Sequence, residues 1–297
     1  MKWEGNRESD NVEDVRGDGG GGGGGGGFGL GGRSIGIGTI AIALAASYFF
    51  GINPATVINL LSGGGGSVAP VQQPQPQTRA APTNDPAVHF VKVVLADTED
   101  VWTQLFRAQN ANYVRPKLVL FSDSTPTSCG QGQSATGPFY CPADQKVYID
   151  LSFYKLMRDR FHVDGEFAQA YVIAHEVGHH VQNLMGISDK VDAARRRATQ
   201  VQSNALSVRL ELQADCFAGV WAFHANEARG ILENGDVEIA LNAATAIGDD
   251  ALQQQARGRV VPDSFTHGSS AQRVRWFKRG ISTGLISECD TFQAQQL

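Results

Sequence analysis

The consecutive residues His175-Glu176-Val177-Gly178-His179-His180 contain the pattern H-E-x-x-H within a stretch that is typical of a helix. Residues four positions apart in a helix lie one turn apart on the same face, so His175 and His179 can reach a single metal ion. Glu176 lies beside them and can take a proton from a zinc-activated water. The motif therefore predicts two zinc ligands, His175 and His179, and a catalytic residue, Glu176.

The sequence around the motif predicts an amphipathic helix. Ile173, Val177, Val181 and Leu184 fall opposite the two histidines, so that side of the helix should be buried. His180 projects toward the apolar side, and we interpret it as a packing or hydrogen-bonding histidine rather than a ligand. The motif also occurs by chance in chains that bind no metal, so a further ligand is needed to support it.

Catalytic zinc takes three protein ligands and keeps one position open, so a third ligand must come from elsewhere in the chain. The strongest candidate is Glu211, in the segment 203–225, whose periodicity predicts a second helix. Asp215 follows one turn later and can accept the spare N–H of His175 or His179. Small residues on the same stripe allow close approach of the motif helix; they are Ser207, Ala218 and Ala222. An exposed acidic pair is the alternative for Glu211 and Asp215.

These residues resemble a known pattern. His175-Glu-Val-Gly-His179 followed by Glu211-Leu-Gln-Ala-Asp215 is similar to the H-E-x-x-H…E-x-x-A-D pattern of gluzincin-type zinc peptidases. Longer blocks resemble the bacterial neutral zinc metallopeptidase family over nearly the whole chain; they are MKWEGNRESDNVEDVR, GPFYCPAD, YVIAHEVGHHVQ, LELQADCFAGVW, AIGDD and RVVPDSFTHGSSAQR. The resemblance implies one zinc ion held by His175, His179 and Glu211, with Glu176 as catalytic acid and base. It also implies a two-layer, zincin-like domain.

A downstream segment, THGSSAQR at 266–273, is similar to the His-plus-Arg segment that follows the ligands in related membrane peptidases. We expect His267 to be catalytic by donating a hydrogen bond to the oxyanion. Arg273, at the start of a predicted helix, can hold a carboxylate such as Asp215 or a substrate terminus. A structural His–Arg pair is the alternative.

The segment 146–150 (KVYID) alternates apolar and polar residues before a helix predicted at 152–160, and so predicts a strand. Peptidases often bind substrate as an added strand on a sheet edge. Val147, Tyr148 and Ile149 are therefore candidates for a substrate-binding strand. An ordinary core or edge strand is the alternative.

The N-terminal part of the chain differs in composition from the rest. Residues 1–33 are polar and end near a glycine tract, so we expect a disordered, Gly-rich cytoplasmic tail. The run 35–52 (IGIGTIAIALAASYFFGI) has about the ~17–25 apolar residues that a membrane-spanning helix needs, which predicts a signal anchor at 34–54. A cleaved signal peptide is the alternative, because Ala43-Leu44-Ala45 resembles a cleavage site.

Residues 55–86 are rich in Gly, Pro, Gln and Ser, which predicts a flexible linker before a zinc metallopeptidase domain at 87–297.

The distribution of basic residues predicts the orientation of the anchor. Lys2, Arg7, Arg16 and Arg33 precede the apolar run, and no Lys or Arg follows it until Arg79. The positive-inside rule then places the N-terminus in the cytoplasm and the catalytic domain in the periplasm or outside the cell. We therefore expect a single-pass protein of the inner (cytoplasmic) membrane.

Four cysteines follow the apolar run, and an even count in an exported domain suggests disulfides. Three pairings are possible. Cys129 and Cys141 flank a Gly-rich loop whose closure would stabilise the fold by up to about 3 kcal/mol, so we pair them. This leaves Cys216 with Cys289.

The composition bounds the remaining possibilities. A chain of 297 residues with 42% apolar residues can hold one sizeable domain plus extra segments. The net charge of -5 and the lack of a long basic cluster give no support for a nucleic-acid partner. For the fold we predict a mostly helical α+β domain, with a helix at 87–112, a small sheet at 118–149, the two ligand helices and a terminal helical region.

These observations together predict a membrane-anchored, zinc-dependent peptidase that hydrolyses peptide bonds. Its partners would be a peptide or protein substrate and the lipid bilayer, reached through residues 35–52. The alternative is a non-proteolytic binding or chaperone-like membrane protein with a structural zinc site. Glu176 favours the peptidase, because a purely structural site has no need of a base there.

Overall fold

The computed structural model describes residues 1–17, 84–134 and 137–297 of the chain. Its helices are α3 (Pro86–Ala108), α4 (Ser152–Phe161), α5 (Glu166–Leu184), α6 (Ile187–Arg195), α7 (Gln200–Arg229), α8 (Asp236–Ala246), α9 (Asp249–Arg257) and α10 (Ser270–Thr283), with short 3-10 turns at η2 (Pro262–Ser264) and η3 (Ile286–Cys289). Its strands are β1 (Val12–Asp14), β2 (Lys117–Phe121), β3 (Ser124–Thr127), β4 (Gly130–Gln133), β5 (Phe139–Cys141) and β6 (Lys146–Asp150).

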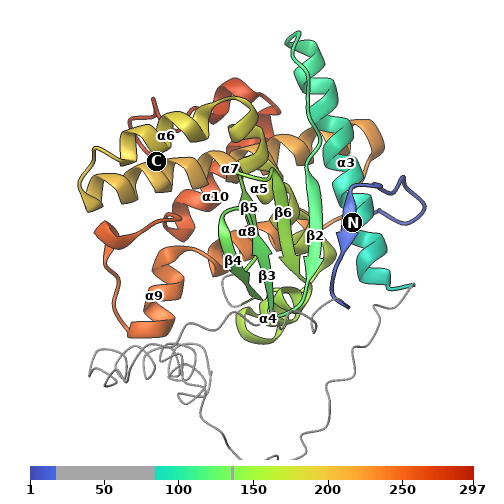
Figure 1. Cartoon of the computed structure of the whole chain (residues 1–297), viewed down its shortest axis with the longest axis horizontal. Coiled ribbons are helices and arrows are strands. Elements are labelled where there is room, and N and C mark those ends of the chain that lie inside the picture. The colour runs from blue at the N-terminus through green and yellow to red at the C-terminus, as the bar shows by residue number, and fades with distance from the viewer. Residues whose placement is uncertain (18–83, 135–136) are drawn as a thin grey trace, which may run out of the picture. The chain divides into compact units, whose positions relative to one another are not determined.

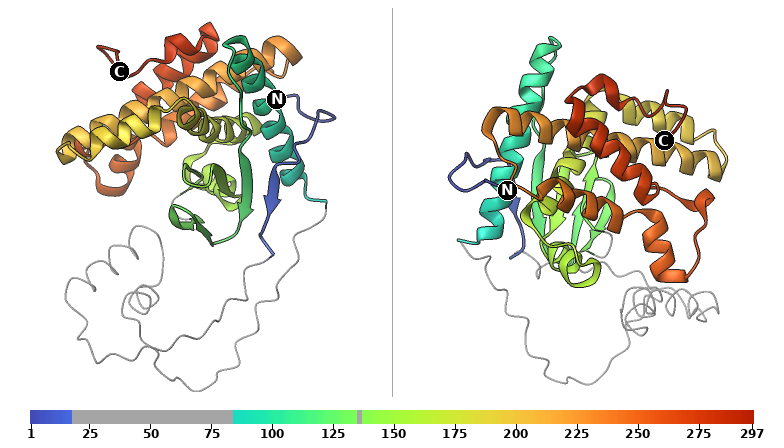
Figure 2. Two further views of the ribbon diagram at one scale, coloured as in Figure 1. Left: turned by 45° about the horizontal axis from the view of Figure 1, so that its top comes forward. Right: turned by 180° about the vertical axis from the view of Figure 1, so that it is seen from behind.

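The strands form one mixed sheet and a separate hairpin (Figure 1). The sheet has the order β1-β2-β6-β5, in which β1, β2 and β6 run parallel and β5 is antiparallel to β6. The hairpin consists of β3 and β4. Helix α5 packs against β5 and β6, and α7 and α8 pack against α5, so the motif helix lies between the sheet and other helices (Figure 2). The predicted class, mostly helical α+β with a small sheet, is confirmed.

Local sequence signals explain where the elements begin and end. Helix α7 starts at a capping box, in which Thr199 accepts from the backbone N–H of Gln202 and the Gln202 side chain accepts from that of Thr199. It ends at Gly230 in the left-handed conformation that glycine adopts most readily. The predicted ligand helix is therefore confirmed and extends by several residues at each end. The predicted strand at 146–150 and the helix after it are also confirmed.

Helices α7 and α10 approach each other closely because glycine stands at their crossing. A Cβ atom on Gly280 would lie 2.0 Å from the backbone oxygen of Cys216. The close crossing brings Arg273 of α10 to the helix that contains Glu211 and Asp215.

The N-terminal residues do not form the disordered tail that their polarity predicts. Met1–Arg16 belong to the same compact unit as residues 84–297, and β1 adds a parallel strand to β2. The prediction of disorder is therefore wrong for residues 1–17. Short polar segments lack a hydrophobic signal of their own, and this one is ordered by pairing with distant residues.

The predicted membrane anchor at 34–54 and most of the linker at 55–86 lie outside the described residues. Within the ranges that are described, every helix is too short or too polar to cross a bilayer. The first domain helix, α3, starts at Pro86, one residue before the predicted boundary, and Asp85 caps it by accepting from the backbone N–H of Ala87.

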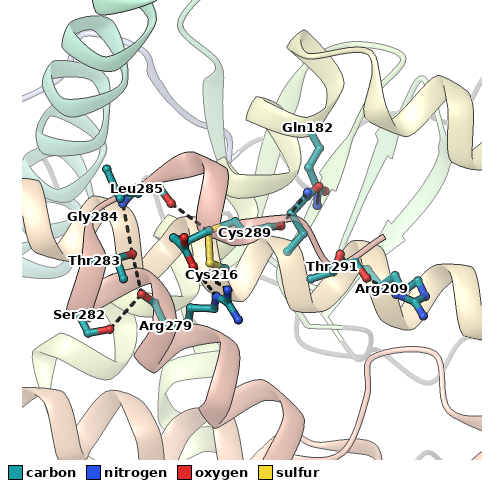
Figure 3. The surroundings of a disulfide bond; sticks show 12 residues. Gln182, Arg209, Cys216, Arg279, Ser282, Thr283, Gly284, Leu285, Cys289 and Thr291 are labelled. Atoms are coloured by element: carbon teal, nitrogen blue, oxygen red, sulfur yellow. Dashed lines mark hydrogen bonds and ion pairs between the residues drawn. A yellow bond between two sulfur atoms is a disulfide. The ribbon is translucent and has the colours of Figure 1, made fainter. Parts of the chain in front are cut away.

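Both predicted disulfides are present. Cys129 pairs with Cys141, and Cys216 pairs with Cys289. Figure 3 shows that the second bond connects α7 to the C-terminal segment. There Gln213 donates to the backbone oxygen of Cys289 at 3.0 Å, which adds a second link between the same two elements.

We expect the two disulfides to differ in their contribution to stability. Cys216–Cys289 closes a separation of 73 residues and Cys129–Cys141 one of 12. The chain-entropy model gives losses in the free energy of unfolding of about 4 kcal/mol for Cys216→Ala with Cys289→Ala and about 3 kcal/mol for Cys129→Ala with Cys141→Ala. Urea denaturation of the full chain measures both. Equal losses, or a larger loss at Cys129–Cys141, would contradict this account.

Candidate metal centre

Helices α5 and α7 approach each other closely at the H-E-x-x-H motif. Gly178 faces Ala214 of α7, and a Cβ atom on Gly178 would lie 3.0 Å from the Ala214 backbone oxygen. A larger residue in the motif would push the helices apart. The small residues that permit this approach are therefore Gly178 of α5 and Ala214 of α7.

Three side chains converge at this crossing with one ligand atom each. These atoms of His175, His179 and Glu211 all lie within 4.8 Å of one another. His175 Nε2 is 3.2 Å from Glu211 Oε2, and His179 Nε2 is 3.5 Å from Glu211 Oε1. Tetrahedral zinc ligands with bonds of about 2.0–2.1 Å lie roughly 3.3–3.4 Å apart, so the separations of Glu211 from the two histidines fit a zinc ion.

The electrostatics of the three side chains also suit a cation. Burial disfavours the charged carboxylate of Glu211, but His179 and His175 outweigh it and hold the pKa of Glu211 well below its usual value. The carboxylate is therefore ionised, and it can bind a metal ion in place of its contacts with the two imidazoles. The donor set of two imidazoles and one carboxylate is one that catalytic zinc sites use.

A buried carboxylate orients the first histidine. Asp215 is fully buried, and one of its oxygens accepts from His175 Nδ1 at 2.8 Å. This bond leaves Nε2 of His175 as the atom that faces Glu211. The sequence left open which histidine Asp215 would contact, and the structure places it against His175.

Asp215 keeps its charge because two other helices supply donors to it. Arg273 of α10 donates to both carboxylate oxygens at 2.8 and 2.9 Å, and Tyr171 of α5 donates at 2.5 Å. Burial raises the pKa of an acid, but Arg273 and His175 outweigh this effect and lower the pKa of Asp215 to about 2. Arg273 was predicted to hold either a carboxylate such as Asp215 or a substrate terminus, and in the structure it binds Asp215.

A second chain of hydrogen bonds orients the other histidine. His179 Nδ1 lies 2.9 Å from Gln182 Oε1, one turn further along α5. Gln182 Nε2 donates to Leu210 O at 2.7 Å and to Gln213 Oε1 at 3.1 Å. Because Gln213 donates in turn to Cys289 O, the disulfide-linked C-terminal segment supports the orientation of His179.

Glu176 lies beside the ligands without being one of them. Its side chain is largely buried and makes no hydrogen bond to any other residue in the described part of the chain. Burial raises the pKa of Glu176, although His175 and His179 oppose the shift. A carboxylate with raised proton affinity and free oxygens is suited to accept a proton.

His267 lies on a loop that packs against the helix of Glu211. The neighbouring Gly268 lies so close to α7 that a Cβ atom there would be 3.1 Å from Leu212. Asp249 Oδ2 accepts the backbone N–H groups of Thr266, His267 and Gly268 at 2.7, 2.7 and 3.0 Å. The other oxygen of Asp249 lies 3.3 Å from His267 Nδ1, which leaves Nε2 free. The imidazole is half exposed, so it can meet a ligand from solvent.

The predicted substrate-binding strand is wrong for most of its length. Strand β6 lies inside the sheet, and Val147 and Tyr148 are paired with β2 on one side and with β5 on the other. Ile149 is buried and paired with Leu120 of β2. A peptide cannot add to a strand whose two sides are already occupied. Alternation alone predicts a strand but not its place in the sheet.

His180 has the structural role that the helical wheel predicts. It is fully buried, Nε2 lies 2.6 Å from Val114 O and Nδ1 lies 3.0 Å from the hydroxyl of Tyr140. Burial lowers its pKa to about 4, so it remains neutral. It therefore connects the motif helix to the sheet side of the fold rather than to the metal centre.

Comparison with known proteins identifies the family. A model of the family described as "Putative neutral zinc metallopeptidase" matches residues 1–292. The chain belongs to this family. It is 54% identical to YpfJ of Escherichia coli (strain K12) over 292 residues, which cover 98% of this chain and 99% of that protein. It is 41% identical to Rv2575 of Mycobacterium tuberculosis (strain H37Rv) over 225 residues, covering 72% and 75%. No solved structure matches the chain.

Three residues of this metallopeptidase site were not predicted. Tyr171 and Gln182 stand four residues before His175 and three after His179, so helical spacing alone places them beside the ligands. Asp249 lies in the block AIGDD, which the family resemblance included but to which no role was given. Its contact with the His267 loop depends on the tertiary fold.

We expect Asp215→Asn to weaken zinc binding by roughly 10–100-fold, because His175 loses the carboxylate that fixes its orientation. Competition titration of the full chain with a fluorescent zinc chelator measures the affinity. Asp249→Asn is the matched control, since Asp249 contacts the His267 loop and none of the three ligands. An unchanged affinity in Asp215→Asn, or an equal loss in Asp249→Asn, would contradict the role given to Asp215.

Proposed function

We propose that this member of the family is a zinc-dependent peptidase that hydrolyses peptide bonds. The observation that supports it best is the convergence of His175, His179 and Glu211 beside a base, Glu176, that is not needed for metal binding. The family description supports a metallopeptidase, and the donor set supports one zinc ion. The two-layer, zincin-like arrangement implied by the sequence resemblance is part of this proposal.

The residues divide the chemistry between them. Zinc held by His175, His179 and Glu211 would supply a Lewis acid that polarises a carbonyl and lowers the pKa of water. Glu176 takes a proton from the attacking water and later gives it to the leaving amine. Burial suits it to both steps, because it raises the affinity of the carboxylate for a proton. The hydrogen bond to Asp249 raises the pKa of His267, and in its protonated form His267 keeps Nδ1 toward Asp249 and donates from Nε2 to the oxyanion.

We also propose that the apolar run at 35–52 attaches the protein to the lipid bilayer of the cytoplasmic membrane and that the domain lies outside the cytoplasm. Two disulfides support an oxidising compartment for the domain. The substrate would then be a peptide or protein of the periplasm or cell surface.

Glu176→Gln is expected to leave zinc bound and to lower turnover by at least about 10³-fold, because the base that takes the proton from water is lost. Glu211→Ala is expected to lower the zinc content itself, because it removes a ligand. Cleavage of a broad peptide library by the full chain, together with metal analysis of each variant, separates the two effects.

Full cleavage activity in Glu176→Gln would refute the mechanism. A wild-type protein that holds zinc and cleaves no peptide in the library would favour a non-proteolytic binding protein with a structural zinc site. Comparison of cellular N-termini between the wild type and Glu176→Gln then identifies the substrates, because cleaved products are missing in the variant.

A further inference from the structure

The N-terminal segment is fastened to the metallopeptidase domain along its length. Leu118 N–H donates to Asn11 O at 2.8 Å and Val15 N–H donates to Leu120 O at 2.9 Å, at the two ends of β1. Near the start of the segment, Lys2 N–H donates to Ile231 O at 2.8 Å. Figures 1 and 2 show the blue strand beside β2 and α3. The segment thus completes the sheet rather than lying loosely upon it.

A buried charge makes this docking specific. Glu99 of α3 has a side chain with no solvent exposure. Its carboxylate accepts from Ser9 Oγ at 2.6 Å, Asn11 Nδ2 at 2.7 Å and Arg7 Nη2 at 3.1 Å. A buried carboxylate needs such donors, and these three all come from the N-terminal segment. The family match begins at residue 1 and so includes them.

An ion pair joins the residue at which the chain leaves this unit to a residue near the point at which it returns. Arg16, the last residue of the docked segment, donates from Nη1 to Asp85 Oδ2 at 2.8 Å. Asp85 also caps the first turn of α3. Residue 16 and residue 85 are therefore neighbours in space, although the apolar run lies between them in the sequence.

We propose that residues 1–16 and 84–297 lie on the same side of the membrane, so that the apolar run does not carry the N-terminus across it. A strand cannot pair with β2 and contact Glu99 through a hydrocarbon layer about 30 Å thick. The inference rests on the proposed membrane attachment but is independent of peptidase activity. It replaces the predicted topology with the N-terminus in the cytoplasm and the domain outside.

Two of the four basic residues that predicted a cytoplasmic N-terminus, Arg7 and Arg16, have another role in the fold. Arg7 pairs with Glu99 and Asp100, and Arg16 pairs with Asp14 and Asp85. These arginines bind carboxylates of the folded unit, so they no longer act as unpaired positive charges beside the apolar run. With the domain placed outside the cytoplasm by its disulfides, the docked N-terminus lies outside as well.

Two single-cysteine variants of the full chain test the topology. Glu4→Cys reports on the N-terminal segment and Glu227→Cys, on α7, reports on the domain; both positions are exposed. The four native cysteines are paired in two disulfides, so the introduced cysteine is the free thiol. A membrane-impermeant maleimide is applied to cells with an intact cytoplasmic membrane, before and after detergent permeabilisation.

Equal labelling of both variants in intact cells is the expected result and supports both the shared side and the location outside the cytoplasm. Labelling of both only after permeabilisation also supports the shared side, but it refutes the proposed location of the domain. Labelling of Glu227→Cys with protection of Glu4→Cys, or the reverse, overturns the inference.

Discussion

The buried ion pair between Asp215 and Arg273 is the interaction on which the metal centre depends. Asp215 lies on α7, Arg273 on α10, and the other partners of the carboxylate, Tyr171 and His175, on α5. One group without solvent exposure thus connects three helices and fixes one metal ligand. Removal of either charge would leave the other buried and unpaired, which is strongly destabilising. The stability of the helical layer and the geometry of the site therefore have the same origin.

The Asp215–Arg273 pair can form only if α7 lies close to α5 and α10, and this close approach positions the rest of the site. Glycine at Gly178 and Gly280 removes the side chains that would otherwise separate α7 from α5 and α10. The second imidazole, His179, is fixed independently through Gln182 and Gln213 to the C-terminal segment, which Cys216–Cys289 connects to α7. The two histidines thus have separate supports, and both direct Nε2 toward Glu211.

Periodicity and motif spacing predicted the elements on which the site stands. The motif helix, the helix of Glu211, the strand β6 and the Cys129–Cys141 disulfide were found in the sequence, because helical spacing and the closure of a short loop are local properties. The Cys216–Cys289 disulfide joins residues 73 positions apart and was predicted by elimination. Three features were missed or wrong for one shared reason. The strand β1, the interior position of β6 and the contact of Asp249 with the His267 loop depend on which distant segments pair, and this is not encoded in any local pattern. Hydrophilic residues such as Ser9 and Asn11 predict disorder until the buried Glu99 that they contact is known.

X-ray absorption spectroscopy at the zinc edge of the zinc-loaded full chain tests the central claim most directly. The account predicts two imidazole nitrogens and one carboxylate oxygen at about 2.0–2.2 Å, and no sulfur, because all four cysteines are paired. A sulfur ligand at about 2.3 Å, or a single imidazole in the coordination sphere, would contradict it.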